Sequence, residues 1–224
     1  MPVVTISRQF GAAGVPIGRA LAERLGYEFL DRALVRQVAL RSGVPEDELE
    51  TYDEKLPGFL QRLGSALAAS SIEDAMPAVP FSEQVPPMNM HDRLVGLTRT
   101  LIQEAAQRGN VVIVGRGAVF VLGKQPGTLH VQLHADLDAR VRFILSRVEE
   151  LPPGEQRNTP LDEPSVTDLC KSVDSARADY IHRLYRADWL DARNYDVSLD
   201  TGRLGVERTV SLLERLVGEW PTGT

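Results

Sequence analysis

The first 26 residues constrain the fold of this chain more than any other stretch. Residues 3–6 form a short apolar run rich in β-branched side chains, and the run stops at a small, glycine-containing segment, residues 7–14. Apolar residues such as Ile17 and Leu21 then recur at helical spacing until Gly26. The pattern predicts a strand, a loop and a helix. Such a loop directs backbone N–H groups and a positive helix end at one point, which suits an anion with several oxygens, above all a nucleotide phosphate tail.

Small residues fill this loop. A backbone that approaches phosphate closely, or takes a positive φ, tolerates little side chain, and Gly11, Ala12, Ala13 and Gly14 meet that requirement. The match to the P-loop pattern G-x-x-x-x-G-K-S/T is nevertheless partial. With Gly14 as the second glycine, the positions of the first glycine, the lysine and the hydroxyl residue are taken by Gln9, Val15 and Pro16. A glycine-rich turn that binds no ligand therefore remains an open alternative for the loop by itself.

Length and charge limit the classes of function. A chain of 224 residues with 43% hydrophobic residues can bury one core, so we expect a single domain over residues 1–224. The formal charge of −6 predicts no nucleic-acid or membrane partner. No apolar run reaches the roughly 18 residues of a membrane span, and the early first strand leaves no room for a leader, so we expect a cytoplasmic protein. Cys170, the single cysteine, falls on an apolar helical stripe and is expected to pack in the core.

Strand and helix patterns alternate along the rest of the chain. Further strands are expected at residues 27–30, 111–114, 129–133 and 195–200, and helices at 34–43, 92–108, 137–148, 165–184 and 206–220. Five such strands predict a parallel sheet with helices on both faces. Two proline-rich stretches interrupt the pattern: residues 76–90 are expected to form a mobile flap, and residues 149–186 a lid that includes the helix at 165–184.

Two charged residues follow predicted strands, at the sheet edge where ligands bind in open parallel sheets. Asp31 comes after the second strand, and Arg116 lies between two glycines after the strand at 111–114. Asp31 has the alternative of capping a helix, and Arg116 that of a surface arginine in a turn.

The remaining charged residues lie mostly on predicted helices. The helix at 165–184 and its end carry Lys171, Asp174, Arg177, Arg183 and Arg186 beside the apolar stripe, where a solvated charged face is the plain alternative. In the helix at 137–148, three arginines (Arg140, Arg142 and Arg147) are placed away from the apolar stripe. In the strand at 129–133 the alternating histidines indicate a polar sheet face rather than a zinc site.

Several short blocks, in order along most of the chain, resemble the cytidylate kinase-like family. They are ISRQFGAAG at residues 6–14, LGY at 25–27, LDR at 30–32 and VIVGRG at 112–117, followed by Lys171, Asp174, Arg177, Tyr180 and the pair Asp188-Trp189. The resemblance implies a three-layer α/β fold of the P-loop nucleoside monophosphate kinase type, with a helical lid. It also implies transfer of the γ-phosphoryl group of ATP, with Mg²⁺, to a nucleoside monophosphate, first of all CMP or dCMP.

The resemblance also implies roles for particular residues. The donor phosphates would lie against the first loop, at Ser7, Arg8, Gly11, Ala12, Ala13 and Gly14. The acceptor would be held by Asp31 and Arg116, with Arg36 as a weaker candidate. The lid would contribute Lys171, Asp174 and Arg177 to catalysis, with Arg183 and Arg186 as further candidates, because phosphoryl transfer depends on positioning and on cations around the transferred group. No metal ligand is assigned.

Three departures from cytidylate kinases bear on function: Val15 and Pro16 replace the P-loop lysine and hydroxyl, and Gly117 stands where an aspartate would follow the arginine. Arg8 is the best internal substitute for the missing lysine charge. Three hypotheses stay open: a CMP-type kinase, a kinase for a different small acceptor, and a nucleotide-binding regulatory protein without turnover.

Overall fold

The computed structural model describes residues 2–31, 90–149 and 162–221. The expected helix at 34–43, most of the expected flap at 76–90 and the first part of the expected lid lie outside the described residues. Within the described part no helix is long and apolar enough to cross a membrane.

The five predicted strands are present and form one parallel sheet. Their order in the sheet is β2-β3-β1-β4-β5, and every adjacent pair is parallel. Thr5 is aligned with Ile113 on one side and with His130 on the other, so β1 is the central strand. The strands are β1 (Val3–Arg8), β2 (Glu28–Leu30), β3 (Val111–Val114), β4 (Thr128–His134) and β5 (Val197–Asp200).

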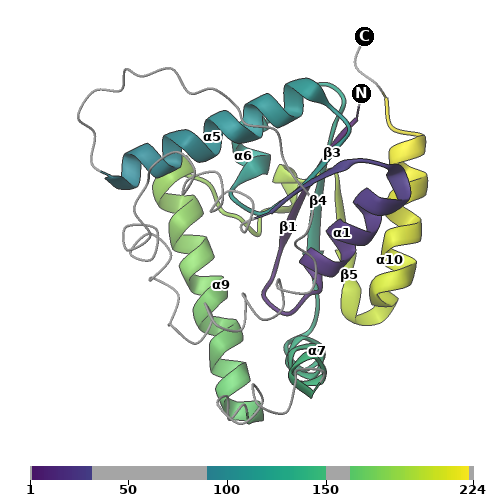
Figure 1. Ribbon diagram of the computed structural model, residues 1–224. Helices are drawn as coiled ribbons and strands as arrows, with labels where there is room; N and C mark the ends of the chain where they lie inside the picture. Colours follow the sequence, from purple (N-terminus) through teal and green to yellow (C-terminus); the bar gives the residue numbers. More distant parts are fainter. Residues whose placement is uncertain (1, 32–89, 150–161, 222–224) are drawn as a thin grey trace.

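Helices cover both faces of the sheet (Figure 1). The pair α1 and α10 lies on one face and the pair α5 and α6 on the other; α7 lies beyond the carboxyl ends of the strands, and α9 runs from α7 back to α5 and α6. The described helices are α1 (Gly14–Leu25), α5 (Met90–Arg108), α6 (Ala118–Leu122), α7 (Leu137–Glu149), α9 (Glu163–Tyr185), the 3-10 turn η1 (Ala192–Asn194) and α10 (Thr201–Gly218). The predicted three-layer α/β fold is thus confirmed.

Three apolar clusters hold these layers together. Side chains of alternate residues in a strand point to opposite faces, so Val4 packs toward α1 and α10 while Val3 packs toward α5. A third cluster joins α7 to α9 and includes Cys170, which is fully buried as its position predicted. Phe10, from the loop after β1, packs against this third cluster. The loop is therefore anchored to the two helices beyond the sheet edge.

Two polar features of the structure add detail to the sequence analysis. The polar face of β4 that the histidines indicate is buried: His130 is 4% exposed, with Nδ1 2.6 Å from Thr5 Oγ1 and Nε2 2.5 Å from the carbonyl oxygen of Gly123. Hydrogen bonds on both ring nitrogens make this burial tolerable. The helix expected from residue 165 begins earlier because Asp162 caps it, accepting a bond of 2.9 Å from the Ser165 N–H. Hydrogen bonds from the Ser165 side chain and from its N–H lower the pKa of Asp162.

A glycine in α1 allows this helix to lie close to the sheet. A Cβ atom on Gly18 would lie 2.5 Å from Val114 Cγ2 and 3.1 Å from Phe29 Cε2, whereas one on Gly96 in α5 would meet nothing within 4 Å. Both glycines lie inside helices, so they share the same loss of helix propensity. They differ only in the space around them.

We expect opposite effects when each glycine is changed to alanine. Gly18→Ala should lower the free energy of unfolding by about 1–3 kcal/mol, since overpacking outweighs the propensity gain. Gly96→Ala should raise it by about 0.5–1 kcal/mol. Urea denaturation of both variants measures the difference. If Gly18→Ala stabilised the protein as much as Gly96→Ala, the close packing of α1 on β3 would be contradicted.

Candidate active site

The loop between β1 and α1 opens at the carboxyl edge of the sheet. It contains two left-handed residues, Gly11 with φ 82° and Ala13 with φ 55°. Ala13 is the N-cap of α1 and provides no side-chain hydrogen bond to the helix. The first backbone N–H groups of a helix have no partner within it, so those of α1 can bind an anion at this edge.

One residue of the loop, Phe10, is held by a closed ring of hydrogen bonds. Its N–H donates to Asp174 Oδ1 over 2.8 Å, while its carbonyl oxygen accepts from Arg140 Nη1 over 3.2 Å. The same Arg140 Nη1 donates to Asp174 Oδ2 over 2.6 Å and completes the ring. Arg140 Nε donates in addition to the carbonyl oxygen of Ala135, just before α7. The side chains of two helices thus fix both polar groups of one loop residue.

Arg177 joins the same group from α9. Its Nη1 lies 2.9 Å from the carbonyl oxygen of Arg8 and 3.4 Å from Asp174 Oδ1, and its guanidinium carbon lies 5.8 Å from the centre of the Phe10 ring. The Arg177 side chain is 24% exposed, compared with 9% for Arg140. Two arginines and one carboxylate leave a net positive charge beside the loop, and Arg177 is the arginine that solvent reaches more readily.

The side chain of Arg8 lies across two glycines. A Cβ atom on Gly14 would lie 2.6 Å from Arg8 Cγ, and one on Gly115 would lie 3.0 Å from Arg8 Cζ. Arg8 therefore extends from the first turn of α1 to the end of β3. Gly11 has a comparable neighbour, since its Cβ would lie 2.9 Å from Arg140 Cβ. In each case the space left by the missing side chain is bordered by an arginine.

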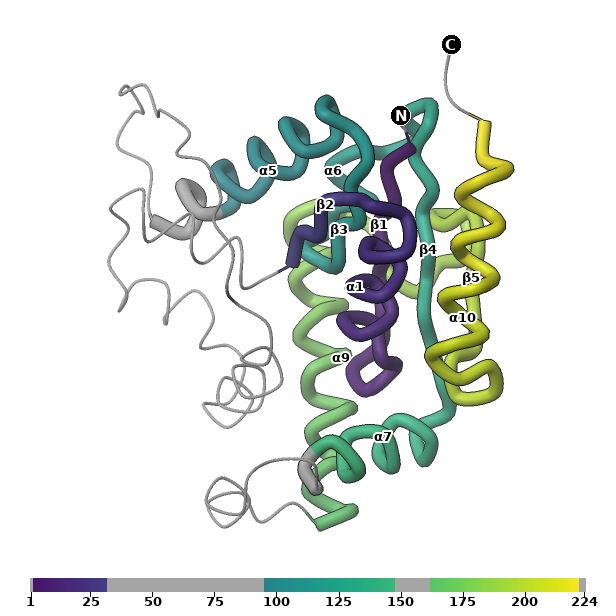
Figure 2. The backbone as a smooth tube through the Cα atoms, turned by 45° about the vertical axis from the view of Figure 1, so that its right-hand side comes forward, coloured from purple at the N-terminus to yellow at the C-terminus, as the bar shows by residue number. Residues whose placement is uncertain are grey.

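The candidate acceptor residues follow the neighbouring strands β2 and β3 (Figure 2). Asp31, directly after β2, is nearly buried and lies 3.9 Å from the guanidinium of Arg19, which also covers the Phe29 ring. After β3, Gly115, Arg116 and Gly117 have φ values of 80°, 57° and 68°. Three consecutive left-handed residues, one of them not glycine, are a costly conformation that places Arg116 at this edge.

Tyr185, at the end of α9, occupies the space beside Gly117. Its ring stacks on Phe120 with centroids 5.4 Å apart, and the Arg99 guanidinium lies 5.2 Å from its centre. A Cβ atom on Gly117 would lie 2.8 Å from Tyr185 Cε2. The aspartate that follows the arginine in cytidylate kinases would not fit here without displacement of Tyr185.

The hydroxyl of Ser7 binds a tyrosine in the described structure. Tyr195 Oη lies 3.1 Å from Ser7 Oγ and 2.5 Å from the carbonyl oxygen of Trp189. Burial raises the pKa of Tyr195, so the phenol keeps its proton and donates it to the carbonyl oxygen, which can only accept. Ser7 then donates to Tyr195 and ties β1 to the segment before β5.

The structure therefore brings some predicted residues together and separates others. Asp174 and Arg177 meet the loop and the backbone of Arg8, whereas Lys171, Arg183 and Arg186 are exposed on α9 or at its end. Arg36 lies outside the described residues.

Arg140 is the residue that sequence reasoning misplaced. The helical pattern places Arg140 away from the apolar stripe of its helix, yet the residue as a whole is only 7% exposed. Helical periodicity cannot detect it, because the partners that bury it, Phe10 and Asp174, are distant in sequence. The available signal was its position in the first turn of a helix that follows a strand at the carboxyl edge.

The donor groups at this edge suit an anion better than a bare metal ion. Among residues 2–31, 90–149 and 162–221 no group of three or more His, Cys, Asp or Glu side chains could hold a metal. Asp174 already accepts bonds from Phe10, Arg140 and Arg177. Backbone N–H groups and arginines also lie at this edge, and these are ligands for phosphate.

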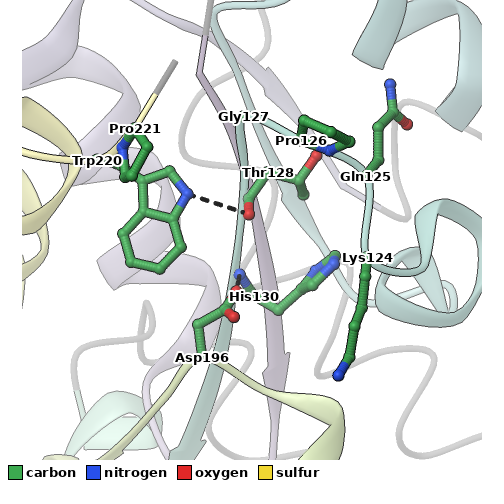
Figure 3. Close-up of a pocket in the computed structure, with 9 residues that line it drawn as sticks. All are labelled: Lys124, Gln125, Pro126, Gly127, Thr128, His130, Asp196, Trp220 and Pro221. Carbon is green, nitrogen blue, oxygen red and sulfur yellow. Dashed lines mark hydrogen bonds between the residues drawn. The ribbon is translucent and has the colours of Figure 1, made fainter. Parts of the chain in front are cut away.

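A cavity of about 310 Å³ lies at the opposite edge of the sheet (Figure 3). It is lined by the start of β4, the residue before β5 and the end of α10, and Trp220 Nε1 donates to the Thr128 carbonyl oxygen beside it. It contains none of the predicted site residues. The candidate site is therefore the open carboxyl edge around the loop.

Comparison with known protein families gives one match that spans most of the chain. The model of the cytidylate kinase-like family matches residues 3–203. A cytidylate kinase from Solibacter usitatus is 28% identical over 186 residues, covering 79% of this chain and 78% of the relative. A uronate isomerase from Corynebacterium glutamicum is 30% identical over 118 residues, or 52% of this chain, but the chain spans only 20% of that relative's length.

Solved structures match the fold over nearly its whole length. An uncharacterised protein from Eubacterium ventriosum superposes with a TM-score of 0.66 at 17% identity, covering 97% of this chain and 99% of the other. A shikimate kinase from Bacteroides thetaiotaomicron gives a TM-score of 0.52 at 17% identity, with 97% and 98% covered. At these identities the likeness shows the fold alone, which is that of the P-loop kinases.

Gly117 should tolerate a side chain less well than another left-handed glycine. Gly26, which ends α1 at φ 66°, has open space where a Cβ would lie. Gly26→Ala should cost only the left-handed strain, about 1–2 kcal/mol of unfolding free energy. Gly117→Ala should cost about 1–3 kcal/mol more, because the new methyl meets Tyr185. Thermal and urea unfolding check this, and equal losses, or no recovery in Gly117→Ala/Tyr185→Leu, would contradict the contact.

Proposed function

Because the chain belongs to the cytidylate kinase-like family, we propose that it transfers the γ-phosphoryl group of ATP to a nucleoside monophosphate, first of all CMP or dCMP. The observation that carries the proposal is the uncapped N-terminus of α1 at the carboxyl end of the central strand, with Arg8, Arg140 and Arg177 around it. Helix N-termini and arginines are the groups that bind a phosphate chain.

In this proposal the loop binds the donor. The N–H groups of Gly11, Ala13 and Gly14 would bind phosphate oxygens, while the Ala12 N–H donates to the Gln9 carbonyl oxygen over 3.2 Å. Arg177, the more exposed of the two clustered arginines, would approach the transferred group. Phosphoryl transfer needs in-line positioning and positive charge around the equatorial oxygens rather than a covalent partner from the protein. Arginine meets this need because it stays charged and can bind two oxygens at once.

The acceptor would bind on the β2 and β3 side of the loop. Asp31 and Arg116 follow adjacent strands, so a phosphate held by Arg116 would face the donor phosphates across Arg8. Asp31 would accept a hydrogen bond from the acceptor's sugar or base. Arg36 remains a proposed further acceptor contact.

Magnesium would enter with the nucleotide. When bound with ATP it would supply positive charge at the phosphates. Pro16 offers no hydroxyl to a metal, and Val15 offers no charge. Arg8 is the proposed source of that charge, because its guanidinium already lies beside the loop. Lys171, Arg183 and Arg186, on α9 and at its end, remain proposed lid residues.

Two other functions are kept as alternatives. A kinase for a different small acceptor is favoured by Gly117, because Tyr185 fills the space beside it. The shikimate kinase with a similar fold phosphorylates a non-nucleotide, but the likeness extends to the fold alone. A nucleotide-binding protein without turnover is favoured by Val15 and Pro16 in the loop.

The direct test is ADP release from MgATP with CMP, dCMP, UMP, AMP, GMP, shikimate or no acceptor. We expect stimulation by CMP or dCMP above the rate without acceptor. Stimulation by another compound alone would replace the acceptor assignment. If no compound stimulates ADP release while MgATP binds in calorimetry, the nucleotide-kinase proposal fails, and another small acceptor or binding without turnover is favoured.

Arg116→Gly should separate stability from acceptor binding. Removing a left-handed non-glycine residue should leave the unfolding free energy unchanged or raise it by up to about 1 kcal/mol. Losing a charged contact to phosphate should raise the acceptor KM about tenfold or more. The matched control is Asn110→Gly, which removes a left-handed residue with φ 52° at the other edge of the sheet. An unchanged acceptor KM in Arg116→Gly would remove this residue from the acceptor site.

A further inference from the structure

The ring around Phe10 has a geometry that a merely stabilising ion pair does not need. Arg140 and Asp174 bind each other over 2.6 Å, and each also binds one backbone group of the same loop residue. Both side chains are largely buried, with 9% and 15% exposed. Charged groups in such surroundings form strong hydrogen bonds when every partner is in place, and losing one partner leaves the other uncompensated.

The packing around Phe10 directs the loop in the same way. The Phe10 ring packs with Val166 and Cys170 of α9 and with Ile144 of α7. Gly11, the next residue, lies against Arg140, since a Cβ atom on Gly11 would lie 2.9 Å from Arg140 Cβ. Gln9, on the other side, accepts a 3.2 Å bond from the Ala135 N–H. Residues 9–11 are thus fixed by α7, by α9 and by the residue Ala135 before α7.

We propose that Arg140 is a positioning residue of the donor site and acts through Asp174 and the Phe10 backbone. The proposal rests on the proposed donor role of the loop. The ring fixes the peptide groups on both sides of Phe10, and therefore the direction of the Gly11 N–H, the first N–H group of the phosphate-binding segment. The conformation that a nucleotide requires is then set before it binds, which lowers the ordering cost of binding.

The same cluster also holds two carbonyl oxygens of the loop. The main-chain carbonyl oxygens of Arg8 and Phe10 accept from Arg177 and Arg140. Both arginines also bind the carboxylate of Asp174. The Arg177 side chain is 24% exposed and can reach a ligand, whereas Nε and Nη1 of the buried Arg140 donate to protein atoms. This difference assigns a positioning role to Arg140 and leaves direct contact to Arg177.

The variants that test this are Arg140→Met, Arg140→Lys and Asp174→Asn in the full chain, with Arg142→Met as the matched control. Arg142 lies on the same helix and is exposed. Two quantities are measured: MgADP affinity by calorimetry without acceptor, and hydrogen–deuterium exchange of the Phe10 amide without nucleotide. Melting temperature is recorded to separate general destabilisation from a local effect.

We expect faster exchange at Phe10 in Arg140→Met and Asp174→Asn. Their MgADP affinity should fall about ten- to a hundredfold, the effect of losing a charge-assisted hydrogen bond. Arg140→Lys should lie between these variants and the wild type, because one ammonium can reach Asp174 and Phe10 but not Ala135 as well. Arg140→Met/Asp174→Asn should be no weaker than the worse single variant, because the two residues act as one unit. Acceptor KM should change less than about threefold in Arg140→Lys.

The outcomes separate the two levels of the proposal. If the wild type binds MgADP and Arg140→Lys and Asp174→Asn bind it equally well, the positioning role is overturned while the kinase proposal stands, even if the variants melt earlier. If donor affinity falls and acceptor KM rises together, in proportion to the loss of melting temperature, Arg140 is structural only. If the wild type binds neither MgADP nor MgATP, the donor site itself fails, and the positioning role fails with it.

Discussion

The strand β1 pairs in parallel with β3 on one side and with β4 on the other, and the site depends on this central position. All five strands run in the same direction, so their carboxyl ends meet at one edge. The loop after β1 is therefore flanked by Gly115 to Gly117 after β3 and by Ala135 after β4. A loop that followed an outermost strand of the sheet would have a neighbouring strand on one side only. In this sheet, charged side chains approach the loop after β1 from both sides.

The order of the strands selects the neighbours, and distant side chains then fix the loop. Phe10 is bound by Arg140 of α7 and Asp174 of α9, which are 34 residues apart in sequence. Arg8, inside β1 itself, lies over Gly14 and Gly115. Each of these contacts joins separate secondary-structure elements, and secondary-structure propensity alone does not predict that these elements meet. The region that binds phosphate in the proposed function is thus a property of the assembled fold rather than of the loop.

Local pattern predicted the elements well. The apolar run at 111–114 became a fully buried strand, and Gly26 ended α1 in the left-handed conformation. Both signals are local: burial on both faces demands continuous apolar residues, and a helix end favours glycine. Arg140 could not be placed in this way, because a charged residue is expected outside unless its partners are known. Its partner Asp174 was expected to contribute to catalysis from the lid, but the sequence does not reveal that the two helices lie close together.

Tyr185 and Gly117 come from elements far apart in the chain, yet neither can change freely while the other stays as it is. A side chain at position 117 needs the tyrosine ring to move, and loss of that ring opens space beside Phe120 and Arg99. The two positions are therefore epistatic. An acidic residue at position 117, after Arg116, is incompatible with the present aromatic stack. A change from one to the other passes through an unfavourable intermediate, unless Tyr185 is replaced first. A change of shape at this edge of the sheet therefore requires positions 117 and 185 to change together.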